Sequence, residues 1–167
     1  MPPPNALRTA VDGESSVTVD DALWPIVIAT WFGRPTEDLV DRYFEHHSEL
    51  LQQARDEQTR IILISDTFAT ERPSPLTRKR IVERTEAQPE DVRYLTIDSF
   101  IVIENPVIRG VVMALAWVYP KMAESKNVGN LSLALEESIE ALRKAGIAPP
   151  KHLVPSAYQR PARPQAA

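Results

Sequence analysis

Two runs near the start of the chain have the residue pattern of β-strands. Residues 16–19 (Ser-Val-Thr-Val) alternate polar and apolar side chains, and residues 26–32 are rich in β-branched and aromatic ones. Asp20 and Asp21 lie between the two runs and suit a turn, and Gly33 ends the second run. The pattern therefore predicts an antiparallel hairpin at the start of the folded domain.

Three later stretches repeat apolar residues at the spacing of an amphipathic helix, at residues 36–57, about 75–87 and about 133–145. Thr36 is a good N-cap for the first helix, Pro75 suits the first position of the second, and Gly146 suits the C-cap of the third. The first helix is strongly acidic, with seven acids, two arginines and a net charge of −5. The second is basic, with a net charge of +3 over residues 71–84.

Another helix, expected at about residues 105–119, is apolar on nearly every side. Asn105 and Pro106 start this helix and Pro120 stops it. Because its side chains leave little polar surface, we expect it to be largely buried.

Three further strands complete the pattern. Residues 61–64 form a continuous apolar run, which is typical of a central strand buried on both faces, and Ser65 and Asp66 follow this run. Another strand lies within residues 92–103, and a short one near residues 126–131. The alternation of strands and helices predicts an α/β fold with a mixed four- to five-stranded sheet, packed helices and an opening β-hairpin.

The two ends of the chain differ in composition from its middle. Eight of the fifteen prolines lie in residues 1–4 and 149–167. We therefore expect disordered tails at residues 1–14 and 148–167, on either side of one α/β domain at residues 15–147. The length of 167 residues suits a single domain of this kind.

Composition excludes several classes of protein. Because the chain has no cysteine, it cannot form a disulfide scaffold, a thiolate zinc site or an iron–sulfur cluster. Its net charge of −4 argues against a dedicated nucleic-acid binder. The N-terminus lacks the features of a signal peptide, and no apolar run approaches the ~20 residues that span a bilayer. We therefore expect a cytoplasmic protein with no membrane partner.

Three motifs stand out along the chain: Asp21-Ala-Leu-Trp-Pro-Ile-Val-Ile-Ala, Ser74-Pro-Leu-Thr-Arg-Lys-Arg and Asn105-Pro-Val-Ile-Arg-Gly-Val-Val-Met-Ala-Leu-Ala-Trp. Together with the order of elements over residues 15–146, these motifs resemble the SpoIIAA-like (STAS/SEC14-like) family of small bacterial proteins. The resemblance implies a STAS-like α/β domain. The better-known relatives are anti-sigma-factor antagonists, which are binding modules switched by phosphorylation of a Ser or Thr after the central buried strand.

Ser74 lies where this resemblance places the phosphorylated residue, eight residues after Asp66. The antagonist pattern Asp-Ser-x-Gly is absent, and Arg72-Pro73-Ser74-Pro75 stands in its place. A phosphate on Ser74 would be stabilised by the helix N-terminus and by basic neighbours, whereas the simpler alternative is that Ser74 caps the helix. The candidate contact surface comprises Ser74 and its neighbours Asp66, Thr67, Arg72, Thr77, Arg78 and Lys79.

Motifs for catalysis or metal binding are few. His46 and His47 are adjacent, so on a helix they point about 100° apart and cannot chelate one metal together, and His47 falls on the apolar face. The nucleophile elbow Gly-x-Ser-x-Gly and the glycine-rich phosphate loops are absent from the sequence. We therefore expect no catalytic residue, no metal site and no cofactor.

The leading hypothesis is a non-catalytic protein-interaction or regulatory module in signalling, with a protein partner and a candidate phosphorylation switch. A homodimer through the acidic and basic helices is one form of this hypothesis. The alternative is a carrier that holds a small molecule, such as a nucleotide or a lipid, and an enzyme that uses Asp66 is the least favoured class. An apolar cavity beneath the 105–119 helix favours the carrier. A filled core with a basic or apolar surface patch favours the module, and a polar cleft around Asp66 favours the enzyme.

Overall fold

The strands of the sheet lie in the order β1-β2-β3-β4-β5-β6 in the computed structural model, which describes residues 7–165. Strands β1 to β3 pair antiparallel and strands β3 to β6 pair parallel, so the sheet is mixed, as predicted. The strands are β1 (Leu7–Asp12), β2 (Ser15–Leu23), β3 (Ile26–Gly33), β4 (Ile61–Thr70), β5 (Thr96–Val102) and β6 (Lys126–Val128).

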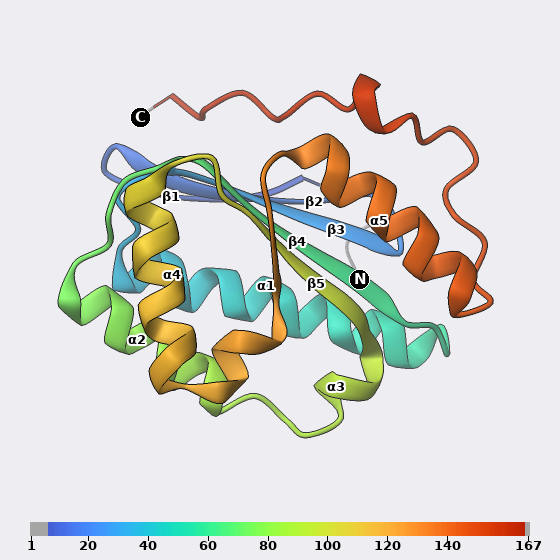
Figure 1. The fold of residues 1–167 in the computed structure, drawn as a ribbon, viewed down its shortest axis with the longest axis horizontal. Coiled ribbons are helices and arrows are strands. Elements are labelled where there is room, and N and C mark those ends of the chain that lie inside the picture. Colours follow the sequence, from blue (N-terminus) through green and yellow to red (C-terminus); the bar gives the residue numbers. More distant parts are fainter. Residues whose placement is uncertain (1–6, 166–167) are drawn as a thin grey trace.

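Helices cover both faces of this sheet (Figure 1). Helices α1 to α4 lie on one side, and α5 and the C-terminal segment lie on the other. The helices are α1 (Glu37–Asp56), α2 (Pro75–Glu86), α3 (Val92–Leu95), α4 (Pro106–Val118) and α5 (Leu131–Lys144), with the short 3-10 helices η1 (Pro120–Glu124) and η2 (Pro155–Ala157). The three-layer arrangement confirms the predicted α/β class.

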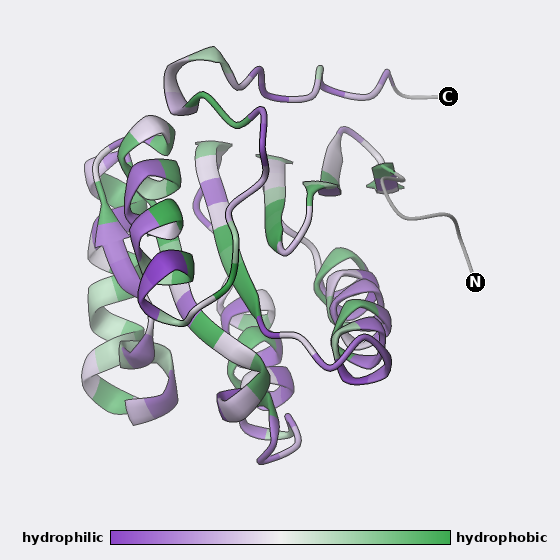
Figure 2. Cartoon of the chain, turned by 90° about the vertical axis from the view of Figure 1, so that its right-hand side faces the viewer, coloured by the Kyte–Doolittle hydropathy of each residue, from purple (hydrophilic) through white to green (hydrophobic). Residues whose placement is uncertain are grey.

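Alternate side chains of the central strand β4 lie on opposite faces of the sheet. Ile62 and Ile64 are buried in the hydrophobic cluster beneath α5, whereas Leu63 packs on the side of α1. Figure 2 shows hydrophobic residues concentrated on the strands and hydrophilic residues on the outer surfaces of the helices. The core therefore consists of two separate layers, one on each face of the sheet.

The start of the sheet extends further than predicted. The β2–β3 hairpin is confirmed, but its turn lies at Trp24 and Pro25, and Asp21 is instead a buried residue of β2. Residues 7–12, expected to be disordered, form the edge strand β1. Arg8 holds this strand through an ion pair with Asp21 at 2.9 Å, and Ala10 enters the core. The sheet thus has six strands rather than four to five. The expectation for residues 1–6 lies outside the described residues.

The C-terminal segment also differs from the expected disordered tail. It crosses the α5 side of the sheet in an extended course (Figure 1). Leu153 and Tyr158 pack against the core, and the Tyr158 hydroxyl donates to the carboxylate of Asp20 at 2.8 Å. As far as residue 165, its prolines therefore belong to an extended segment that covers the α5 side of the sheet. Residues 166–167 lie outside the described part.

Helix α4 was expected to be largely buried, and this prediction is wrong. Ile108 is its one buried residue, and Trp117 near its end is 94% exposed. The helix lies at the side of the molecule, where it extends away from the sheet towards η1 (Figure 1). Within residues 7–165, no helix combines the length and the apolar character needed to cross a membrane.

Candidate functional site

A cavity of about 870 Å³ lies beneath α4. Its floor is the α1 side of strands β4 and β5, and its walls come from α1, α2, α3 and η1. The volume falls within the range of roughly 300–1,000 Å³ that is usual for small-molecule sites. The space between α4 and the sheet is therefore large enough for a ligand of moderate size.

Helix α4 forms the outer wall of this cavity. Asn105 caps the helix, because its side-chain oxygen accepts a hydrogen bond from the backbone N–H of Val107 at 2.9 Å. The inward-facing residues recur at helical spacing and are all aliphatic: Ile108, Val111, Val112 and Leu115. Val111, Val112 and Leu115 have the pattern of core residues in the sequence but are only half-buried in the structure. They are half-buried because they face the cavity and do not pack against other side chains.

Helix α1 supplies an aromatic wall. Its cavity-lining residues Val40, Tyr43, Phe44 and His47 occupy one helical face. The Tyr43 ring stacks on His47, with 5.9 Å between ring centroids, and also contacts Trp31 of β3 at 5.3 Å. Four of these five side chains are aromatic and hold one another in place, so this wall is preformed.

His47 introduces a polar group into the aromatic wall. Its Nδ1 atom lies 3.0 Å from the side-chain nitrogen of Gln88. Because an amide nitrogen only donates, Nδ1 accepts and the ring proton resides on Nε2. Burial lowers the pKa of His47 to about 4, so the ring is neutral at pH 7. Its Nε2 is buried without a hydrogen-bond partner among the described residues.

Tyr43 and Ser65 form a second polar point in the lining. Burial raises the pKa of the Tyr43 hydroxyl, and the neighbouring hydroxyl of Ser65 on β4 opposes this rise. Both residues line the cavity and both are neutral at pH 7. The interior therefore combines an apolar surface with a few uncharged hydrogen-bonding groups, which is the usual composition of a small-molecule site.

Charged residues line only one end of the cavity, around α3, the start of β5 and η1. Arg93 forms an ion pair with Glu124, Lys121 pairs with Glu86 at 3.7 Å, and Asp98 pairs with Lys126. Thr96, at the start of β5, has a buried hydroxyl without a hydrogen-bond partner in the described part of the chain. This end is a polar mouth whose cations are already neutralised.

The candidate contact surface predicted from the sequence lies at the start of α2. Ser74 caps this helix, because its hydroxyl oxygen accepts from the backbone N–H of Thr77 at 3.1 Å. Thr77 is 3% exposed and donates to the backbone oxygen of Pro35 at 3.2 Å, so its hydroxyl is not accessible to a partner. Ser74 is half-buried. In this structure its side chain acts as the helix cap, which was the simpler of the two roles considered from the sequence.

The basic side chains of α2 divide into two groups. Arg80 binds both carboxylate oxygens of Asp41 on α1 at 2.8 Å, and Arg84 approaches the same carboxylate at 3.3 Å. The acidic and basic helices, considered above as halves of a dimer contact, are therefore joined within one chain. The remaining basic candidates, Arg72, Arg78 and Lys79, lie exposed or half-buried on the surface.

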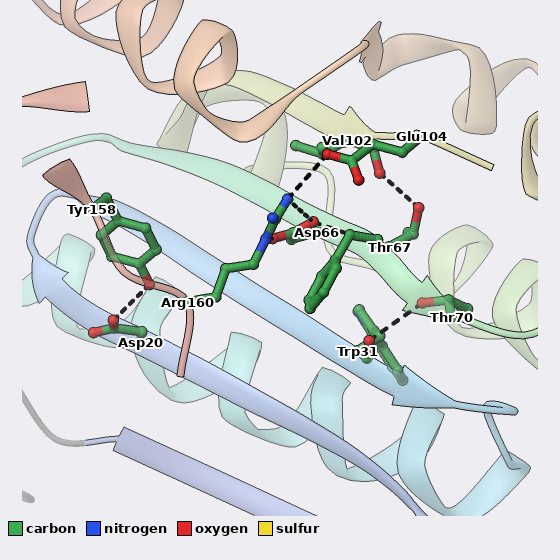
Figure 3. A network of polar contacts seen from close by, with 10 residues as sticks. Asp20, Trp31, Asp66, Thr67, Thr70, Val102, Glu104, Tyr158 and Arg160 are labelled. Carbon is green, nitrogen blue, oxygen red and sulfur yellow. Dashed lines mark hydrogen bonds and ion pairs between the residues drawn. The ribbon is translucent and has the colours of Figure 1, made fainter. Parts of the chain in front are cut away.

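Asp66 lies on the opposite face of the sheet from the cavity, beneath the C-terminal segment (Figure 3). Its carboxylate is fully buried and accepts a hydrogen bond from Nε of Arg160 at 2.6 Å, and Arg160 also reaches Glu104 at 3.3 Å. Burial raises the pKa of Asp66, and the pairing with Arg160 opposes this rise. The neighbouring Thr67 donates to the backbone oxygen of Val102 at 2.6 Å.

Of the cavity-lining residues, Thr67 was among the site candidates predicted from the sequence, and the others were not. One signal was available: a helix that is apolar on every side, when it lies at the edge of a sheet, has more apolar surface than its neighbours cover. Among residues 7–165, no three His, Asp or Glu side chains form a group that could hold a metal ion. No protein-family model and no curated protein matches the chain, so the family resemblance rests on the sequence motifs alone.

Proposed function

We propose that this protein binds and carries a small, mainly apolar molecule in the cavity beneath α4. The observation that carries the proposal is the cavity itself, with its aliphatic wall from α4 and its aromatic wall from α1. An apolar cavity in this position is the feature that favours a carrier over an interaction module with a filled core. Glu90 and Arg93 at the charged end of the cavity are exposed to solvent, so this end gives a ligand a route of entry.

The physical basis is the hydrophobic effect. An apolar molecule in this cavity removes both its own surface and the aliphatic and aromatic lining from water. Each buried methylene contributes about 0.8 kcal/mol, so a ten-carbon chain gains about 8 kcal/mol before the entropic cost of association. We therefore expect dissociation constants in the micromolar range or weaker for simple aliphatic probes.

The lining supports binding rather than chemistry. Among the lining residues, His47 has the type of side chain that most often acts as a general base. It hydrogen-bonds to Gln88, however, and not to a carboxylate that would raise its basicity. Asp66, the acid considered for an enzyme, lies on the other face of the sheet and is paired with Arg160. The proposal therefore contains no catalytic step.

The interaction module remains a second candidate, and one observation connects it to the cavity. Thr67 and Thr70 at the end of β4, and Pro73 in the loop that leads from β4 to Ser74, all line the cavity. A ligand would touch the segment that carries the candidate contact surface. The affinity of a partner that recognises the start of α2 would then depend on whether a ligand occupies the cavity.

Substitutions on the two sides of α4 test the proposal. Val112→Phe adds a ring to the cavity wall, whereas Met113→Phe places the same ring on the outer side of the helix, where Met113 is 58% exposed. Each protein is titrated with the uncharged fluorescent dye Nile red. We expect saturable binding by the unchanged protein and by Met113→Phe, and affinity at least tenfold weaker for Val112→Phe. Equal affinity of both variants would contradict a site beneath α4.

A further inference from the structure

The charges around the cavity limit what its ligand can be. Acidic lining residues outnumber basic ones, with Glu90, Asp98 and Glu124 against Arg93 and Lys121. Both basic side chains are already engaged, Arg93 by Glu124 and Lys121 by Glu86. An anionic headgroup at the mouth would therefore meet a surplus of acid and would have to displace an existing ion pair to find a cation.

The deeper part of the cavity is uncharged. The lining residues that α1, α2, α4 and β4 contribute include no Asp, Glu, Lys or Arg in the part of the chain that the structure describes. Moving an ionised carboxylate or ammonium into such surroundings without a partner is far more costly than moving a neutral polar group. An anionic ligand therefore fits neither the mouth nor the interior, and a cationic group finds no partner in the interior.

Two residues of the lining nevertheless each carry a neutral, buried polar atom that has no partner among residues 7–165. The Nε2 atom of His47 carries a proton, because Nδ1 accepts from Gln88, and it is buried without an acceptor among residues 7–165. The hydroxyl of Thr96 is likewise buried and unpartnered within the same residues. Buried donors of this kind are normally satisfied by the protein or by what it binds. A hydroxyl or carbonyl oxygen on a ligand would satisfy one of them.

We infer that the molecule carried beneath α4 is an uncharged lipophile with a hydroxyl or carbonyl oxygen, an alcohol or ketone rather than a fatty acid, a phospholipid or a nucleotide. The inference rests on the proposed function and narrows its ligand class. It replaces the nucleotide considered from the sequence, because a phosphate chain needs free cations or a helix N-terminus at its site.

Competition with bound Nile red tests this inference with three probes that share a ten-carbon chain: 1-decanol, 2-decanone and sodium decanoate at pH 7.5. We expect decanol and decanone to displace the dye with affinities at least tenfold tighter than that of decanoate. Displacement by decanoate at the same concentrations as decanol would overturn the inference while leaving the proposed function intact. Failure of all three probes, together with absence of Nile red binding, would instead overturn the proposed function.

The variant His47→Phe tests the hydrogen bond separately. Phenylalanine keeps an aromatic ring beside Tyr43 but removes the Nε2 donor, and retained Nile red binding shows that the cavity is still formed. We expect decanol and decanone to bind about tenfold more weakly to His47→Phe, with each affinity corrected for the affinity of that variant for Nile red, which itself carries a carbonyl oxygen. Thr96→Val removes the second donor and serves as the matched comparison. Unchanged affinity for both oxygen-bearing probes in both variants would overturn the assignment of a hydrogen-bonding ligand.

Discussion

Arg160 holds the buried carboxylate of Asp66 across 94 residues of sequence, with its Nε donating to that carboxylate at 2.6 Å (Figure 3). The guanidinium also lies 4.0 Å from the centroid of the Phe68 ring. One side chain of the C-terminal segment thus neutralises a carboxylate of the central strand β4 and covers an aromatic ring beside it. The segment is a structural part of the domain through this contact.

Replacement of this arginine should destabilise the protein. Arg160→Ala leaves a fully buried carboxylate without its cation, and breaking a buried pair on one side costs about 3–5 kcal/mol. Because Arg160 is itself 29% exposed, we expect a smaller loss of about 2 kcal/mol in the free energy of unfolding. Urea denaturation at pH 7 measures this value.

Arg163→Ala provides the control for that experiment. Arg163 lies on the same segment but bonds to the exposed backbone oxygen of Glu14, so its loss should change the unfolding free energy by less than about 0.5 kcal/mol. Adding Asp66→Asn to Arg160→Ala should recover part of the lost stability, because it removes the unpaired charge. Equal effects of the two alanine variants would contradict a special role for the Arg160–Asp66 pair.

The buried imidazole of His47 predicts a specific pH dependence of stability. Burial lowers its pKa from 6.5 to about 4 in the folded protein. Between these values the unfolded chain binds the extra proton, so stability present above pH 6.5 is lost as the pH falls towards 4. We expect a loss of about 2 kcal/mol from this group between about pH 7.5 and pH 5, because each pKa unit corresponds to about 1.4 kcal/mol.

His47→Phe isolates this contribution, since the carboxylates titrate in both proteins. Urea denaturation of the two proteins at several pH values should give curves that converge as the pH falls, with the variant losing less stability. Parallel curves would mean that His47 is not buried in its neutral form. The raised pKa of Asp66 acts in the opposite direction, because the folded state then binds the proton more tightly, and it is common to both proteins.

The cap of α2 predicts different outcomes for two substitutions of Ser74. Ser74→Ala removes the oxygen that accepts from the Thr77 backbone N–H and should cost about 1 kcal/mol. Ser74→Asp keeps a capping oxygen and adds a negative charge that the helix dipole favours, so its stability should stay close to the original. Thermal unfolding compares the three proteins, and equal losses for both variants would exclude the capping role.

The same pair of variants tests the interaction module. In an affinity pull-down from the native cell lysate, a partner whose recovery changes with Ser74→Asp but not with Ser74→Ala would support a phosphorylation switch. A partner that both variants recover equally would support a module without a switch at Ser74.

Local signals in the sequence were sufficient for much of the fold. The continuous apolar run at residues 61–64, the cap at Thr36 and the proline at position 75 each act over a few residues, and β4, α1 and α2 lie where these signals predict. The edge strand β1 was missed because its stability comes from contacts with β2, such as the pair of Arg8 with Asp21, and not from a strand pattern of its own.

The candidate site could not be predicted from local signals of this kind. The apolar residues of α4 predict burial, but their pattern does not distinguish packing against side chains from lining a cavity. His47 could be placed on the apolar face of its helix, whereas its contact with Gln88, 41 residues away, required the fold. The proline-rich C-terminus similarly gave no sign that Arg160 would reach Asp66, because that contact joins segments far apart in sequence.

The most direct test of the carrier function uses the tryptophans as reporters of position. Trp31 lines the cavity, whereas Trp117 lies on the outer side of α4 and is 94% exposed. Two proteins, each retaining one of these residues with the other tryptophans replaced by phenylalanine, are titrated with 10-bromo-1-decanol, whose bromine quenches tryptophan on contact. We expect saturable quenching of Trp31 and only weak, non-saturating quenching of Trp117. Equal quenching of both residues, or none of Trp31, would contradict a ligand site beneath α4.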